Sequence, residues 1–164
     1  MFRGEFSPQL AGVARPCKLH LIDAWWTLYG ERFPDWGDYT DFGTLGTRQA
    51  FEEARRAVPD AIFHVGDDLE ILLSFPDGYF DWVYLDTTHE YVHTCDELAV
   101  LDRKVTGFIL GDDWHDDPAH PHAGVAKAVR EFTVRSAWNL LPRDSFGQWG
   151  VRRVVTSDSG GGGL

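Results

Sequence analysis

Short apolar runs alternate with stretches of helical spacing along most of the chain. Four runs have the composition of buried strands, at residues 18–24, 61–65, 79–86 and 106–111. Helical spacing is found between and after these runs, at residues 47–58, 66–73, 91–103 and 125–132. In the last segment Val125, Ala128, Val129 and Phe132 take positions i, i+3, i+4 and i+7 of one helical face. The pattern predicts strands that alternate with helices.

Strands that alternate with helices are typical of an α/β fold with a mostly parallel sheet. Two further β-like runs, residues 137–141 and 149–155, are assigned to an antiparallel edge. We predict one domain over residues 1–156, followed by a disordered Gly-rich tail at 157–164. Residues 25–46 have no clean period and are interpreted as a lid or substrate-binding segment.

The charge of the chain restricts its partners. A formal net charge of −11 argues against a nucleic-acid or anionic-membrane surface, because such surfaces need clustered Lys and Arg. No apolar run approaches the length of a membrane-spanning helix, and no secretory signal pattern is found. We therefore expect a cytoplasmic protein that binds neither nucleic acid nor membrane. The residues leave the oligomeric state open, with a homo-oligomer as one alternative.

Acidic residues and a histidine follow two of the predicted strands. Asp86 ends one strand and His89 follows it, while Asp112 and Asp113 come directly after the next strand. The carboxyl ends of neighbouring parallel strands share one edge of a sheet, where open α/β sheets bind ligands. Carboxylate oxygens suit a hard cation such as Mg²⁺, and a nearby histidine suits general-base catalysis. Any one of these carboxylates could instead cap a helix or lie in solvent, but their joint pattern favours a site.

The other histidines have plainer interpretations. His93 lies four residues past His89, so a zinc pair on one helical face is conceivable, but no third soft ligand is obvious. His115, His120 and His122 fall in the segment HDDPAHPH, which is interpreted as a solvated turn rich in proline.

Asp23 ends the first predicted strand and follows Gly4 at about the 20-residue interval of nucleotide-binding α/β folds. In such folds an acidic residue at this position accepts hydrogen bonds from ribose hydroxyls. Gly66, Asp67 and Asp68 follow the next strand, where they could meet an adenine. These residues together favour a nucleoside-containing cofactor.

Several of these segments, in this order and spacing, resemble the class I S-adenosylmethionine-dependent methyltransferases, over roughly residues 3–155. The matching segments are GEFSPQL, KLHLIDAW, FDWVYLD, THEY, the acid Asp96, FILGDDW and GVAKAVREF. Within that class, the closer resemblance is to the metal-dependent sugar O-methyltransferases of the macrocin type.

The resemblance implies a Rossmann-like methyltransferase fold and a role for each candidate residue. Asp86, Asp112 and Asp113 would hold Mg²⁺, and His89 would be the base that deprotonates a hydroxyl of the acceptor. S-adenosylmethionine would be bound by Asp23 at its ribose, with Gly4, Gly66, Asp67, Asp68 and Asp86 as further cofactor-binding residues. The acceptor would be a sugar or another polyhydroxylated small molecule.

The chain departs from this family in two places. The Gly-Gly before the family's fifth strand is Thr106-Gly107 here. The family's first strand and glycine turn have no counterpart beyond Gly4, so we expect a fold truncated at its N-terminus by one strand. Two alternatives therefore stay open: a metal-dependent hydrolase or hydroxylase-like enzyme that uses the same Asp and His residues, and a non-catalytic, truncated methyltransferase-like protein.

Overall fold

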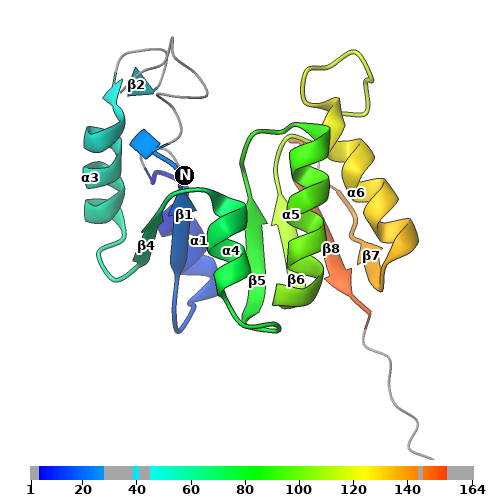
Figure 1. Ribbon diagram of the computed structural model, residues 1–164, viewed down its shortest axis with the longest axis horizontal. Coiled ribbons are helices and arrows are strands. Elements are labelled where there is room, and N and C mark those ends of the chain that lie inside the picture. Colours follow the sequence, from blue (N-terminus) through cyan, green and yellow to red (C-terminus); the bar gives the residue numbers. More distant parts are fainter. Residues whose placement is uncertain (1–3, 28–38, 41–44, 144–145, 155–164) are drawn as a thin grey trace, which may run out of the picture. The chain divides into compact units, whose positions relative to one another are not determined.

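The computed structural model describes residues 4–27, 39–40, 45–143 and 146–154. The chain divides into two compact units, Met1–Ser74 and Phe75–Leu164, which are described in turn (Figure 1). Most of the predicted lid at residues 25–46 and the whole predicted tail at 157–164 lie outside the described residues. The prediction of one domain over residues 1–156 stays a prediction.

The first unit is built around two parallel strands. Its elements are α1 (Ser7–Ala14), β1 (His20–Asp23), β2 (Tyr39–Thr40), β3 (Leu45–Gly46), α3 (Thr47–Ala57), β4 (Ile62–Val65) and α4 (Asp68–Ser74). Strand β1 pairs with β4 in parallel, from His20 opposite Ile62 to Asp23 opposite Val65. Strands β2 and β3 form a short antiparallel pair. The carboxyl ends of β1 and β4 therefore share an edge, as predicted.

Aromatic rings and small helical residues form the core of this unit. Trp25 is buried with Ala50 and Ala54 of α3, and Phe51 and Phe63 pack against them. The small alanines let the helix approach the sheet closely, so the large indole can be almost fully covered.

The second unit contains a four-stranded sheet with two helices. Its elements are β5 (Phe80–Leu85), α5 (Tyr91–Lys104), β6 (Val105–Gly111), α6 (Ala123–Arg135), β7 (Trp138–Leu140) and β8 (Trp149–Arg153). The strand order is β5-β6-β8-β7. Strands β5 and β6 are parallel, whereas β8 runs antiparallel to both β6 and β7, which confirms the antiparallel edge.

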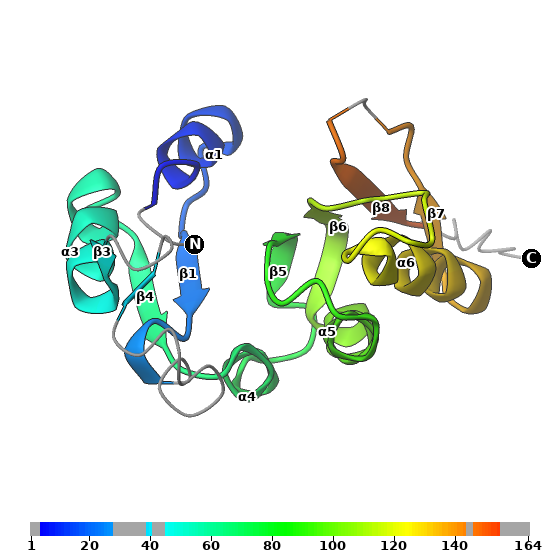
Figure 2. The same cartoon turned by 90° about the horizontal axis from the view of Figure 1, so that it is seen from above.

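Helices α5 and α6 lie side by side along one face of this sheet (Figures 1 and 2). The apolar stripe of each helix turns inward, because Leu98, Leu101 and Val129 are buried with the strand residues Ile109 and Val151. This is the burial that the spacing of apolar residues predicts for amphipathic helices on a sheet.

The sequence pattern locates each strand and helix of the second unit to within a few residues. In the first unit it misses α1 and the short β2–β3 pair. Among the described residues, β1 pairs only with β4 and β5 only with β6; the absence of one further strand stays a prediction. No helix in the described part of the chain is long and apolar enough to cross a membrane.

Candidate functional site

The edge of the second unit's sheet brings the predicted acidic residues together. Leu85 pairs with Gly111 at the ends of the parallel strands β5 and β6. The next residues are Asp86 on one strand and Asp112 on the other, and the N–H of Asp112 donates a hydrogen bond to the Leu85 carbonyl over 3.3 Å. Parallel pairing therefore places Asp86 beside the Asp112-Asp113 pair.

His89 connects the two acidic segments. Its Nε2 lies 3.2 Å from Oδ1 of Asp86 and 3.0 Å from Oδ2 of Asp113. The imidazole is about four-fifths covered, since its exposed fraction is 20%. Two carboxylates therefore contact one nitrogen of His89, and the imidazole is only partly open to solvent.

The backbone at this site is held in an uncommon conformation. His89 has φ 59° and Asp113 has φ 62°, both in the left-handed region that non-glycine residues rarely adopt. Such residues cost about 1–3 kcal/mol each and cluster at active sites, where the surrounding structure holds them in place. The two strained residues are the two that contact each other through the imidazole and carboxylate.

The carboxylates change the proton affinity of His89. Burial disfavours the charged imidazolium, but the hydrogen bond with Asp86 and the negative charges of the nearby aspartates outweigh it and raise the pKa of His89. The same hydrogen bond lowers the pKa of Asp86. A general base must be unprotonated, so His89 can serve as one at neutral pH when the charge of these carboxylates is offset.

Asp112 has different surroundings from Asp113. Its Oδ1 accepts a hydrogen bond from the Asp113 N–H over 2.9 Å, and its side chain lines a small pocket that also includes His89. The other residues that line this pocket are Leu85, Thr87, Thr94, Glu97, Val125 and Trp149. Glu97, which the sequence pattern does not single out, is buried and accepts a hydrogen bond from the Thr87 hydroxyl over 3.1 Å.

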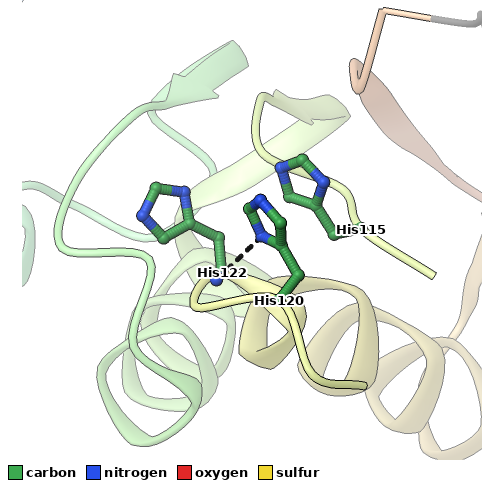
Figure 3. A group of neighbouring side chains, drawn as sticks. All are labelled: His115, His120 and His122. Atoms are coloured by element: carbon green, nitrogen blue, oxygen red, sulfur yellow. Dashed lines mark hydrogen bonds between the residues drawn. The ribbon is translucent and has the colours of Figure 1, made fainter. Parts of the chain in front are cut away.

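The segment HDDPAHPH is a turn with exposed residues, which agrees with its interpretation as a solvated turn, but its three histidines also lie close together. The donor atoms of His115, His120 and His122 lie within 4.8 Å of one another (Figure 3). A second group with the same spacing consists of His89, Asp113 and His122. The signal that could have found these residues is their position, because they follow directly after the Asp112-Asp113 pair.

Close packing of two helices brings His122 to the site. A Cβ on Gly124, in the first turn of α6, would lie 2.7 Å from the backbone nitrogen of Tyr91, the first residue of α5. Only glycine allows this approach. His122 precedes α6 and His89 precedes α5, so their ring centroids come to 4.6 Å.

The alternative of a zinc pair assumed that His89 and His93 share one helical face, and this assumption is wrong. Helix α5 begins at Tyr91, so His89 lies before the helix and does not share a helical face with His93.

The cofactor residues predicted in the first unit have three different kinds of surroundings. Asp23 and Gly66 are adjacent, since the Gly66 N–H donates to the Asp23 carbonyl over 3.1 Å at the carboxyl ends of β1 and β4. Asp67 caps α4, accepting from the Glu70 N–H over 3.0 Å. Gly4 has φ 75°, and a Cβ there would lie 2.9 Å from the Ala54 Cα, so it packs against α3. The binding of a cofactor by these residues, by Asp68 and by Asp86 stays a prediction.

Comparison with known proteins gives a clear result only at the level of structure. No protein-family model and no curated protein sequence matches the chain. A solved structure described as a type 11 methyltransferase from Sulfolobus solfataricus matches with a TM-score of 0.56 and 14% identity, covering 94% of this chain and 80% of that one. One described as an O-methyltransferase from Klebsiella pneumoniae matches with a TM-score of 0.56 and 15% identity, at 94% and 80% coverage. The SAH-bound methyltransferase PaMTH1 of Podospora anserina matches with a TM-score of 0.54 and 16% identity, at 94% and 78% coverage.

At these identities the likeness is one of fold. The alternating strands and helices, the parallel pairs β1–β4 and β5–β6 and the antiparallel edge formed by β8 and β7 agree with it. The chain has the Rossmann-like α/β fold of the class I methyltransferases.

Proposed function

We propose that the chain is an S-adenosylmethionine-dependent, Mg²⁺-dependent O-methyltransferase of the macrocin type. Its acceptor is a sugar or another small polyhydroxylated molecule in the cytoplasm. The observation that carries the proposal is the meeting of Asp86 and Asp113 at Nε2 of His89, at the carboxyl ends of two parallel strands in a methyltransferase fold.

The first unit supports the cofactor part of the proposal. Asp23 offers a carboxylate at the end of β1, where folds of this type bind ribose hydroxyls. Gly66 beside it has φ 152°, a conformation that side chains rarely adopt, so the backbone can be approached closely there. The structural relative from Podospora contains SAH, the demethylated product of S-adenosylmethionine.

The second unit supports the metal part. Asp86, Asp112 and Asp113 offer carboxylate oxygens, the donors that Mg²⁺ prefers. They fit a cation chemically, because Asp86 and Asp113 bring two carboxylates to one place and Asp112 lies next to Asp113. Bound Mg²⁺ would lower the pKa of an acceptor hydroxyl.

His89 is the proton acceptor in this proposal. With Nε2–H donating to the carboxylates of Asp86 and Asp113, Nδ1 takes the proton from the acceptor hydroxyl while that oxygen forms a bond to the methyl carbon of S-adenosylmethionine. The bond from this carbon to sulfur breaks, which leaves a neutral S-adenosylhomocysteine and a methyl ether. Asp86 and Asp113 orient the imidazole and stabilise its charge after the transfer.

One observation favours the alternative of a metal-dependent hydrolase or hydroxylase-like enzyme. His89, Asp113 and His122 offer two imidazoles and one carboxylate within 4.8 Å, a donor set that transition metals use in other enzymes. This alternative gives no role to Asp23 or Gly66. An enzyme of this kind would turn over without S-adenosylmethionine.

The test is a transfer assay with methyl-labelled S-adenosylmethionine and a panel of monosaccharides and polyols. We expect label to appear in an acceptor with Mg²⁺ and to be lost with EDTA. Asp86→Asn should abolish transfer, because it removes a charged ligand. The matched control is Asp81→Asn, an exposed residue at the other end of β5, which should keep full activity. Transfer that persists in EDTA would refute the metal role, and no transfer to any acceptor would refute the methyltransferase.

A further inference from the structure

We propose that His115, His120 and His122 form a binding site for a divalent transition metal ion such as Zn²⁺. This site is separate from the carboxylate site proposed for Mg²⁺. The three side chains come from one connection, between β6 and α6, and their imidazoles gather at one place (Figure 3). The rings of His115 and His120 are stacked with centroids 3.4 Å apart, and the centroid of His122 lies 5.4 Å from that of His120.

The donor set selects the class of metal. Imidazole nitrogens suit Zn²⁺, Cu²⁺ and Ni²⁺, whereas Mg²⁺ prefers oxygen. In a tetrahedral zinc site the Zn–N distance is about 2.0–2.1 Å, so the three nitrogens, now within 4.8 Å of one another, would move closer together on binding one ion. Three histidine ligands leave a fourth position for water, as in catalytic zinc sites.

Asp113 provides the outer support that zinc-binding histidines usually have. Nδ1 of His122 lies 2.7 Å from Oδ1 of Asp113, so Nδ1–H donates to the carboxylate and the Nε2 lone pair is available to a metal. Nε2 of His115 lies 3.5 Å from the same oxygen. Nδ1 of His120 accepts a hydrogen bond from the His122 N–H over 3.1 Å, and coordination through this nitrogen would replace that bond.

Side-chain contacts hold the segment that carries these histidines. The buried indole of Trp114 donates to Asp116 over 2.8 Å. The guanidinium groups of Arg130 and Arg143 lie over the Trp114 ring, at 4.8 and 4.4 Å from its centroid, and both pair with Asp116. A site built on such a network loses little entropy when it binds an ion.

The two proposed metal sites meet at Asp113, which is a ligand at the carboxylate site and only an outer partner of His122 at the histidine site. Oδ2 of Asp113 faces His89, and Oδ1 faces His122. Asp86 has its contact with His89 and lies outside the group of three histidines. Substitution of Asp86 therefore affects only the carboxylate site, and substitution of His115 or His120 affects only the histidine site.

The test is a competition titration of the untagged, metal-stripped chain with Zn²⁺ and a chromophoric chelator. We expect one equivalent to bind tightly. The double variant His115→Ala/His120→Ala should lose more affinity than the roughly 10–100-fold that follows loss of an outer partner. His20→Ala, which changes a histidine of the first unit, and Asp86→Asn should bind zinc like the unchanged chain. Circular dichroism of each variant checks that the fold is intact.

Two results would overturn the proposal. One is the absence of stoichiometric zinc binding by the unchanged chain. The other is unchanged affinity in the double variant, with affinity lost in His89→Ala, which would assign the ion to His89, Asp113 and His122 instead. Substitution with Co²⁺ gives a second readout, because its visible absorption bands should report nitrogen ligands in the unchanged chain and weaken in the double variant.

Discussion

Replacing His89 with glutamine should lower kcat for methyl transfer by about 100- to 10,000-fold, the usual contribution of a positioned general base. Glutamine keeps a polar side chain of similar reach but cannot accept the hydroxyl proton. Cofactor affinity should change little, because His89 is proposed to act on the acceptor hydroxyl and not on the ribose, which Asp23 is proposed to bind. Steady-state kinetics and cofactor titration on the same preparations measure both quantities.

Two comparisons make this prediction specific. His89→Asn should cost as much activity and fold at least as well, because asparagine tolerates the left-handed backbone that His89 adopts at φ 59°. His64→Gln, a change in strand β4, should retain activity. If His89→Gln kept most of its activity on acceptors with ordinary hydroxyls, His89 would be a structural residue that only orients Asp86 and Asp113.

Replacing Trp149 with alanine should lower the free energy of unfolding by about 3–5 kcal/mol, the range for buried tryptophan. Trp149 is only 4% exposed, and its ring covers Gly111 so closely that a Cβ there would lie 2.5 Å from it. Its indole N–H donates to the Asp112 carbonyl over 2.9 Å. Replacing Trp149 with alanine therefore opens a cavity and leaves the Asp112 carbonyl without its hydrogen-bond donor.

Urea denaturation followed by circular dichroism measures this loss. Trp149→Phe is an intermediate change, since it keeps one aromatic ring and removes the N–H together with the rest of the indole. We expect it to cost about 1–3 kcal/mol, the penalty for an unsatisfied buried polar group. A Trp149→Ala variant as stable as the unchanged chain would show that the β6–β8 edge does not depend on this indole.

The strands and the acidic part of the site were predictable for a simple reason. Apolar runs mark buried strands whatever their neighbours, and parallel pairing then brings residues at strand ends together, as it does Asp86 and Asp112. Helix α1 was missed because its sequence, SPQLAGVA, shows neither a clear apolar stripe nor a capping side chain.

The histidine group could not be predicted from spacing. His115, His120 and His122 lie in an irregular connection, and their positions depend on tertiary contacts: the Trp114 network and the approach of α6 to α5 at Gly124. The contact of His122 with Asp113 depends on the same tertiary contacts. Their position after the Asp112-Asp113 pair signals that they lie near the site, but the local sequence does not give the distances between them. The left-handed backbone at His89 and Asp113 likewise becomes visible only in the structure.

Isothermal titration with S-adenosylhomocysteine tests the central claim most directly, because it needs neither the acceptor nor the metal. The account predicts binding at one site and a loss of about 1.5–3 kcal/mol, or roughly 10- to 150-fold, in Asp23→Ala, the range for hydrogen bonds to a charged group. The control Asp60→Ala, at an exposed residue before β4, should bind as tightly as the unchanged chain. Absence of binding, or equal binding by Asp23→Ala, would contradict the account.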